Sequence, residues 1–267
     1  MKIPVFQIDA FTDVPFSGNP AAVCPLDEWL PDDVMQSIAL EMNLSETAFF
    51  VPSTDDSGDY DLRWFTPTVE VDLCGHATLA SGHVVLSKLR PELDHVRFHT
   101  RSGVLGVQRR KKMLELDFPR NPPSVMTDAS EIDAVISALG SKPNEILHAN
   151  TTIAVFENEA QVAELEPDFS AVAKLKEPWL AATAPADSDK YDFVSRFFVP
   201  TAGVNEDPAT GSSHTILMPY WSDRLEATEL VGRQISKRGG TMHCRLLGDR
   251  VMIAGSVVEM MTGELTI

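Results

Sequence analysis

Cysteine is scarce in this sequence, and the cysteines present form no recognisable set. There are three in 267 residues, Cys24, Cys74 and Cys244, and none belongs to a CxxC pair. A disulfide framework or a thiolate zinc site is therefore not expected. We expect the protein to reside in a reducing compartment. Because there is also no apolar run of about 18 residues and no N-terminal run with a cleavage site, we expect a cytoplasmic protein without a membrane partner.

Basic residues are in short supply relative to acidic ones. The sequence has 22 Lys and Arg against 39 Asp and Glu, which gives a formal net charge of −17. The resulting field repels nucleic-acid backbones and anionic membranes, so nucleic acid is not expected as a partner. A small anionic substrate is compatible with this charge only where helix N-termini or arginines create a local positive potential.

Motifs that hold cofactors or metals are missing as well. The sequence has no GxGxxG, no Walker lysine motif and no HExxH, and so offers no visible anchor for a nucleotide or a catalytic zinc. His95 and His99 could share one face of a strand, but no carboxylate follows at ligand spacing. A surface strand is the favoured interpretation there, and neither a cofactor nor a metal is expected.

What the sequence does contain is an internal match. Residues 63–78 (RWFTPTVEVDLCGHAT) align without a gap to residues 196–211 (RFFVPTAGVNEDPATG), at an offset of 196 − 63 = 133 that is about half the chain length. Five of the aligned positions are identical, among them Arg63 and Arg196. The match predicts a duplication in which each half repeats a strand, a Pro-containing loop, a tight turn, a helix and a β-hairpin.

Two domains follow from this repeat and from the usual domain size of roughly 100–150 residues. We predict an N-terminal half at 1–120 and a C-terminal half at 128–267, with the last strand free to return to the first domain. A linker rich in Pro and turn formers is expected within 119–130. An amphipathic surface helix is predicted over 31–43.

The predicted fold class is α+β. One helix begins near His76 and is apolar on most sides, which indicates burial. Its counterpart begins near Gly211, and Pro219 limits or kinks it. Because short β-like segments surround both helices, we expect two pseudo-symmetric domains, each a curled, mostly antiparallel or mixed sheet around a central helix.

The two helix starts are candidate anion sites. The turns LCGHAT at 73–78 and EDPATGSSH at 206–214 place free backbone N–H groups at the positive end of a helix, where a carboxylate or oxyanion is stabilised. If the halves are related, both starts could face one cleft between them. The alternative is that both are merely capped, with Asp72 and Asn205 as the caps.

Glu46 is an acid within an otherwise apolar, strand-like run, LSETAFFV. It could simply face solvent. It could instead be a general acid or base whose partly desolvated carboxyl titrates nearer to working pH. In the second case, His76 and Asp207 are the polar groups that hold the substrate or relay the proton.

Five segments together resemble one family. They are GNPAAV at 18–23, SETAFF at 45–50, CGHAT at 74–78, NEDPATGSSH at 205–214 and GDRVMIAG at 248–255. In this order they are similar to the PhzF-like phenazine-biosynthesis proteins. The resemblance implies a diaminopimelate-epimerase-like fold, a homodimer, and an isomerase that moves a proton in trans-2,3-dihydro-3-hydroxyanthranilate without metal or cofactor.

The resemblance also implies roles for individual residues. The glutamate that shuttles the proton in the family corresponds to Glu46 here. The residues predicted to be catalytic are Glu46, His76 and Asp207. The residues predicted to bind substrate are Gly75, Thr210, Gly211 and Ser212.

Relatives that racemise or epimerise amino acids use two cysteines, one at each helix start. Here the gap-free offset places Asp207 opposite Cys74, which favours a proton-moving isomerase and a packing role for Cys74. Two alternatives stay open. The first is an amino-acid epimerase that uses Cys74 with Asp207 or Glu46, and the second is a ligand-binding or protein-interaction module that has lost the reaction.

Overall fold

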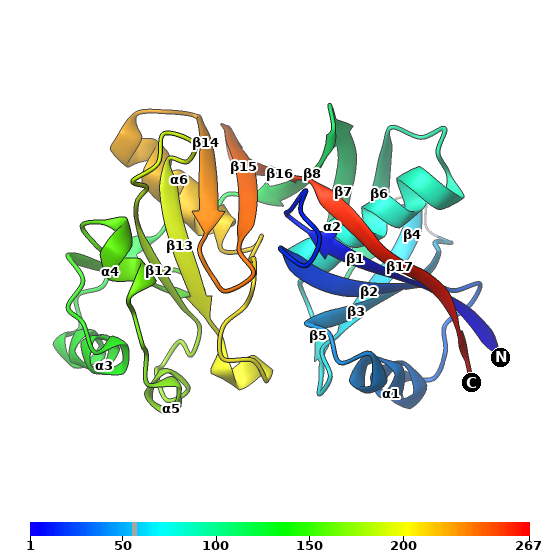
Figure 1. Ribbon diagram of the computed structural model, residues 1–267, viewed down its shortest axis with the longest axis horizontal. Helices are drawn as coiled ribbons and strands as arrows, with labels where there is room; N and C mark the ends of the chain where they lie inside the picture. Colours follow the sequence, from blue (N-terminus) through cyan, green and yellow to red (C-terminus); the bar gives the residue numbers. More distant parts are fainter. Residues whose placement is uncertain (55–57) are drawn as a thin grey trace. The chain divides into compact units, whose positions relative to one another are not determined.

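The computed structural model describes residues 1–54 and 58–267 as an α+β protein with mostly strands, few helices and mixed strand pairing (Figure 1). The chain divides into two compact units, one of Met1–Phe118 with Met252–Ile267 and one of Pro119–Val251. The second unit therefore begins within the predicted linker. The end of the chain, which the predicted C-terminal half included, belongs to the first unit.

The first unit is built on a mixed sheet. Its strands are β1 (Lys2–Ala10), β2 (Asn19–Pro25), β3 (Glu46–Pro52), β4 (Tyr60–Phe65), β5 (Glu70–Val71), β6 (His95–Thr100), β7 (Gly103–Arg110), β8 (Met113–Pro119) and β17 (Val257–Thr266). The pairs β17–β1, β1–β2, β3–β4, β4–β5, β6–β7 and β7–β8 are antiparallel, while β2–β3 and β4–β6 are parallel. The returning strand β17 thus pairs with the first strand of the chain.

Helix α2 (Gly75–Val84) is the buried helix of this unit. All of its residues except His83 are buried, and it packs against β1, β2, β3 and β7. Small side chains allow this close approach: a Cβ added at Gly82 would lie 2.5 Å from a methyl carbon of Val107. A π-helical turn, Val85–Leu89, continues the helix to Arg90. The predicted surface helix is α1 (Asp32–Met42), which begins directly after Pro31.

The second unit also has mixed strand pairing. Its strands are β9 (Ser124–Val125), β10 (Glu145–His148), β11 (Thr152–Val155), β12 (Leu180–Pro185), β13 (Phe193–Phe198), β14 (Glu229–Gln234) and β15 (Gly240–Leu247), and β16 (Arg250–Gly255) spans the boundary between the units. The pairs β9–β10, β10–β11, β12–β13 and β14–β15 are antiparallel, and β11–β12 and β13–β14 are parallel.

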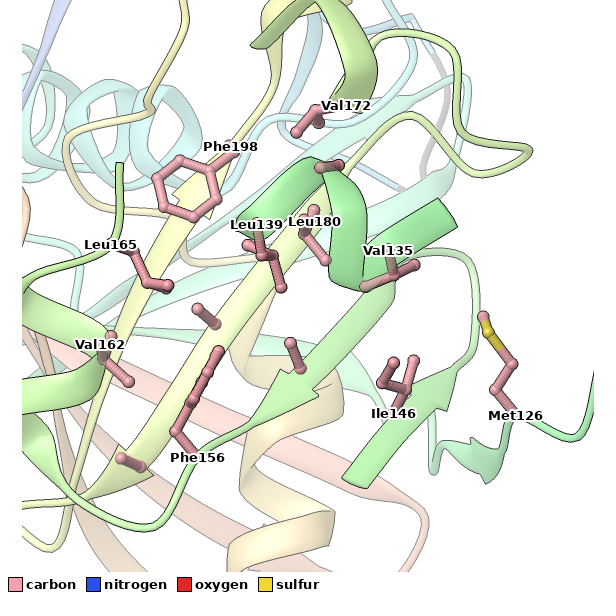
Figure 2. Packing of buried hydrophobic residues seen from close by; sticks show 14 of the residues in the cluster. Met126, Val135, Leu139, Ile146, Phe156, Val162, Leu165, Val172, Leu180 and Phe198 are labelled. Atoms are coloured by element: carbon pink, nitrogen blue, oxygen red, sulfur yellow. The ribbon is translucent and has the colours of Figure 1, made fainter. Parts of the chain in front are cut away.

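Helices α3 (Ala129–Leu139), α4 (Glu159–Ala163) and α5 (Phe169–Val172) contribute to the apolar core of this unit (Figure 2). Phe156, Leu180 and Phe198 are buried there together with helix side chains such as Leu139 of α3. Burying a side chain of this size stabilises a fold by about 1.5–3 kcal/mol. The core therefore fixes the strands β11 to β13 that lead to the second helix start.

Helix α6 (His214–Leu225) is the counterpart of α2. It begins three residues later than the predicted start at Gly211, because residues 211–213 form a tighter turn in which the His214 N–H donates to the Gly211 carbonyl (3.0 Å). Pro219 lies inside the helix and does not end it, since the helix continues to Leu225.

Strand pairing repeats with the internal sequence match. Phe49 pairs with Arg63 in the first unit, and Ala182 pairs with Arg196 in the second, so both partners shift by 133 (182 − 49 and 196 − 63). In each unit the strand that carries the arginine also pairs in parallel with a later strand, β4 with β6 and β13 with β14. The duplication seen in the sequence is therefore also a duplication of topology.

Beyond these strands the gap-free alignment no longer holds. Phe65 pairs with Glu70 in the first unit, and the corresponding Phe198 pairs with Glu206 in the second. The intervals are 70 − 65 = 5 and 206 − 198 = 8, so the second copy has three additional residues. They fall where a 3-10 turn, Pro200–Ala202, occurs.

Candidate active site

Glu46 and His76 meet inside the first unit. Glu46 is the first residue of β3, and His76 lies in the first turn of α2. The Glu46 Oε2 atom lies 3.0 Å from His76 Nε2, and the two side chains are only 18% and 5% exposed. The contact does not have hydrogen-bond geometry, and among the described residues neither atom has a hydrogen-bond partner. The solvent-facing alternative for Glu46 is therefore wrong, and its carboxylate is directed at the imidazole.

The other ring nitrogen of His76 faces two buried groups. Asn19 Nδ2 lies 3.1 Å from His76 Nδ1, and Cys74 Sγ lies 3.5 Å from the same atom. Asn19 is the first residue of β2 and is fully buried. Asn19 is not among the predicted site residues, because Asn followed by Pro is typical of a turn and indicates no chemistry.

Burial controls the protonation of this cluster. Desolvation, with a smaller effect of the Glu46 charge, raises the pKa of the Cys74 thiol to about 11, so Cys74 is protonated at neutral pH. Desolvation lowers the pKa of His76, but the negative charges that Cys74 and Glu46 can carry outweigh it and hold the pKa above its usual value. While Cys74 is a neutral thiol, only Glu46 supplies such a charge.

The same three side chains are a candidate metal-ligand set that motif spacing did not reveal. One donor atom each from Glu46, Cys74 and His76 lie within 4.8 Å of one another, and zinc takes these donor types. Binding would require Cys74 to lose a proton whose pKa is about 11. Both ring nitrogens of His76 also already face protein groups, so the cluster fits proton transfer better than metal binding.

The start of α2 is open rather than capped. Its N-cap is Cys74, and no side chain bonds to the helix start. The predicted cap Asp72 is wrong, because it is exposed and its carboxylate lies 3.5 Å from Arg101. The first-turn N–H groups of Gly75 and His76 have no intrahelical partner and can therefore receive an anion.

The corresponding helix start in the second unit is also uncapped by side chains. The N-cap of α6 is Ser213, which makes no side-chain cap bond, and the predicted cap Asn205 is exposed and lies outside the helix. Gly211 is buried at this turn, and Ser212 is partly exposed. The predicted free N–H groups are not found in the first turn of α6, because the N–H groups of residues 214–216 donate to the three preceding carbonyls of residues 211–213.

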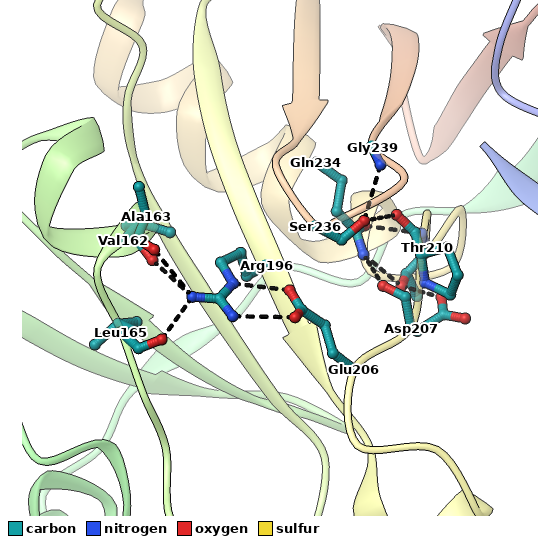
Figure 3. Close-up of polar contacts among 11 residues, drawn as sticks. Val162, Ala163, Leu165, Arg196, Glu206, Asp207, Thr210, Gln234, Ser236 and Gly239 are labelled. Carbon is teal, nitrogen blue, oxygen red and sulfur yellow. Dashed lines mark hydrogen bonds and ion pairs between the residues drawn. The ribbon is translucent and has the colours of Figure 1, made fainter. Parts of the chain in front are cut away.

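A buried glutamine shapes the loop before α6 (Figure 3). Gln234 accepts a bond from the Thr210 N–H (2.8 Å) and donates to the Asp207 carbonyl (2.7 Å), while the Thr210 hydroxyl donates to the Asp207 carboxylate. Ser236 donates to the Pro208 carbonyl (2.6 Å). Gln234 is not among the predicted site residues, because its role depends on the pairing of β14 with β13 rather than on a local motif.

Arg196 also holds the loop before α6, through the residue that precedes Asp207. Arg196 makes two bonds to Glu206, at 2.7 and 3.0 Å, and also donates to the carbonyl of Leu165 (2.7 Å) (Figure 3). In the first unit Arg63 makes the equivalent pair of bonds to Glu70, at 2.7 and 2.9 Å. The two arginines that are identical in the internal match therefore each make a two-bond ion pair with the equivalent glutamate.

The matched Arg–Glu pairs show that the predicted equivalence of Asp207 and Cys74 is wrong. Glu70 corresponds to Glu206, an offset of 206 − 70 = 136, and the same offset carries Cys74 to Thr210 (74 + 136). Asp207 thus lies three residues before the position equivalent to Cys74. It reaches the helix start through its bond from Thr210, not as the residue at the start itself.

The predicted site residues therefore form two sets, each within its own unit. Glu46, Gly75 and His76 lie together at the start of α2, and Asp207, Thr210, Gly211 and Ser212 lie in the turn before α6. A cleft that joins the two sets stays a prediction. In the described part of the chain, no helix has the length and apolar composition to cross a membrane.

Known proteins share this sequence and fold along their whole length. Residues 8–263 match the family PhzC-PhzF, described as phenazine biosynthesis-like protein. An uncharacterized isomerase of Pseudomonas aeruginosa is 48% identical over 265 residues, which cover 99% of each chain. A PhzF-family crystal structure from Enterococcus faecalis has a TM-score of 0.92 at 42% identity, with 100% of both chains covered.

A more distant similarity concerns the fold alone. A hydroxyproline epimerase from Agrobacterium vitis has a TM-score of 0.62 at 10% identity, covering 99% of this chain and 92% of that one. The family resemblance drawn from the five sequence motifs is confirmed by a match that spans nearly the whole chain. The chain therefore belongs to the PhzC-PhzF family of phenazine biosynthesis-like proteins.

Proposed function

We propose that this enzyme is an isomerase that relocates a proton within a small carboxylated, amine-bearing substrate similar to dihydro-hydroxyanthranilate. The observation that carries the proposal is the buried contact of 3.0 Å between Glu46 and His76 at an uncapped helix start. Relatives that are 42–48% identical over nearly their full length are named isomerases, which supports the reaction class.

Glu46 is the proposed proton shuttle. Its carboxylate removes a proton from one carbon of the substrate and returns it to another, so the double bonds move and the composition does not change. His76 places Nε2 at 3.0 Å from the carboxylate and stabilises its charge. The N–H groups of Gly75 and His76 receive the substrate carboxylate, which supplies local positive potential in a protein of net charge −17.

A two-thiol racemase is a poorer fit. Burial holds the pKa of Cys74 at about 11, so little thiolate is present at neutral pH to act as a base. The position equivalent to Cys74 in the second unit is Thr210, and Cys244 is buried within β15. No second thiol therefore lies at a helix start.

An assay with dihydro-hydroxyanthranilate and a panel of amino acids in D₂O tests the reaction class. We expect a product of unchanged composition with shifted double bonds, detected by ¹H NMR, and an unchanged rate after treatment with a chelator. Deuterium exchange at an amino-acid α-carbon that is lost in Cys74→Ser would instead favour the epimerase. Binding without any product would favour the non-catalytic alternative. A rate lost to the chelator and restored by zinc would contradict metal-free chemistry.

We also propose that the turn before α6 binds the substrate, through Asp207, Thr210, Gly211 and Ser212. Ser212 is partly exposed and the Thr210 hydroxyl is already bound to Asp207, so Ser212 is the side chain best placed to donate to an anion. Ser212→Ala should raise KM about tenfold with little change in kcat, because one hydrogen bond to a charged group is lost. Ser37→Ala on α1 is the matched control. An unchanged KM in Ser212→Ala would remove this hydroxyl from the binding site.

A further inference from the structure

Two buried groups converge on the Nδ1 atom of His76, on the side of the ring away from Glu46. Asn19 Nδ2 lies 3.1 Å and Cys74 Sγ 3.5 Å from Nδ1, while Glu46 Oε2 lies 3.0 Å from Nε2. Asn19 is 0%, His76 4% and Cys74 5% exposed. Bulk water therefore has little access to this nitrogen, and the two protein groups decide whether it carries a proton.

Both groups are donors toward the ring. The Asn19 amide nitrogen carries two N–H bonds and accepts nothing. The Cys74 thiol keeps its proton at neutral pH and can donate its S–H. An unprotonated Nδ1 can accept a hydrogen bond from either donor. A protonated Nδ1 would instead point its N–H at the Asn19 N–H, with the two nitrogens 3.1 Å apart.

We infer that Asn19 and Cys74 are positioning residues that hold neutral His76 in the tautomer with its proton on Nε2, the ring nitrogen that lies beside Glu46. This assigns Cys74 a task other than that of a base. The opposite tautomer would turn the Nε2 lone pair toward the Glu46 carboxylate, which repels it. The tautomer follows from the contacts alone, and its catalytic consequence rests on the proposed function.

Asn19, but not Cys74, also opposes a second protonation of the ring. Glu46 favours the imidazolium through its negative charge, and the thiolate form of Cys74 would do so at high pH. Asn19 acts in the other direction, because an imidazolium would need an acceptor at Nδ1. In the described part of the chain, Glu46, Cys74 and Asn19 are the polar side chains with contacts of 3.0–3.5 Å to the ring nitrogens, so their balance sets the charge of the ring.

Nitrogen-15 NMR on the full chain, with ¹⁵N in the histidine rings, tests the inference without any substrate. The His76 signals are assigned by their loss in His76→Gln, and the spectrum is followed from neutral to alkaline pH until the ring is neutral. We expect a protonated Nε2 and a bare Nδ1 in the wild type. A neutral ring with its proton on Nδ1 would overturn the inference.

Variants of the two donors sharpen the test. Asn19→Asp offers an acceptor and should keep His76 doubly protonated to higher pH, while Cys74→Ser retains a donor and should keep the wild-type tautomer. We expect kcat in Asn19→Asp to fall roughly 10- to 100-fold, as for other partners that orient a functional histidine. The exposed His148 is the internal control, and its signals should not change. An Asn19→Asp titration identical to that of the wild type would also contradict the inference.

The outcome for the tautomer is separate from the outcome for the reaction. If the enzyme shows no isomerase activity while the wild-type ring carries its proton on Nε2, the proposed function fails and the positioning inference stands. If activity depends on Glu46 while neutral His76 carries its proton on Nδ1, the positioning inference fails and the proposed function stands. Should Asn19→Asp fail to fold, the wild-type titration still decides the question.

Discussion

Glu46→Gln is expected to lower kcat by roughly 10²- to 10⁴-fold, the range that a positioned general acid or base contributes. The amide has nearly the same shape as the carboxyl group but cannot accept a proton. The contact with His76 Nε2 can persist as a neutral polar contact, so the fold and substrate binding should be retained. Steady-state kinetics measures the loss, and a ligand-dependent thermal shift verifies binding.

Two further variants make this result specific to position and chemistry. Glu46→Asp keeps the acid but shortens its reach, and should retain part of the activity lost in Glu46→Gln. Glu264→Gln removes an exposed carboxylate that pairs with Lys2 on the same unit and should leave kcat unchanged. If Glu46→Gln keeps more than about a tenth of the wild-type kcat, Glu46 is not the shuttle.

Acid is expected to destabilise the second unit through His214, by about 3 kcal/mol between pH 6.5 and pH 4. Burial lowers the pKa of His214 from 6.5 to about 4. Its Nδ1–H donates to the Thr210 carbonyl (2.9 Å), and Nε2 has no hydrogen-bond partner in the described chain. The folded state thus holds a neutral ring that packs against Phe193, at 5.6 Å between centroids.

The direction of this effect follows from proton counts. Between pH 4 and 6.5 the unfolded chain binds a proton at His214 that the folded chain does not bind. The free energy of unfolding therefore rises with pH across this window, and it falls as the pH is lowered. His76, whose pKa is raised, makes the opposite contribution: its stabilisation is present at low pH and is lost as the pH rises through its folded-state value.

Urea unfolding at a series of pH values checks the expectation, with fluorescence of the buried Trp221 as one probe of the second unit. His214→Gln keeps a donor for the Thr210 carbonyl but does not titrate, so its curve should be flatter than that of the wild type in this window. His148→Gln removes an exposed histidine and should follow the wild type. Parallel wild-type and His214→Gln curves would show that His214 does not titrate in this window.

Local patterns were sufficient to locate the first half of the candidate site. An acid within an apolar strand and a histidine at the start of an apolar helix are visible in the sequence, and the structure brings Glu46 and His76 to 3.0 Å. The site's supporting residues were not visible. Asn19 and Gln234 act through strand pairing with segments far along the chain, and no local spacing encodes that pairing.

The second half of the site shows why a gap-free comparison failed. The sequence match is strongest along the strands that carry Arg63 and Arg196, where main-chain pairing fixes the register. Loops tolerate insertions because their backbone is exposed, and the three additional residues fall in such a loop. The helix caps were mispredicted for a related reason, since Asp72 and Asn205 are acceptable cap residues that lie outside the turn that begins each helix.

The return of β17 to the first unit has a consequence for protein engineering. Ile267 donates its N–H to the Met1 carbonyl (2.9 Å), so the two ends of the chain lie side by side at the end of the paired strands β1 and β17. A circular permutant that starts at Met252 and joins Ile267 to Met1 by a short linker would make the first unit one continuous segment. Expression of that segment alone would test whether the first unit folds, and holds the Glu46–His76 pair, without the second.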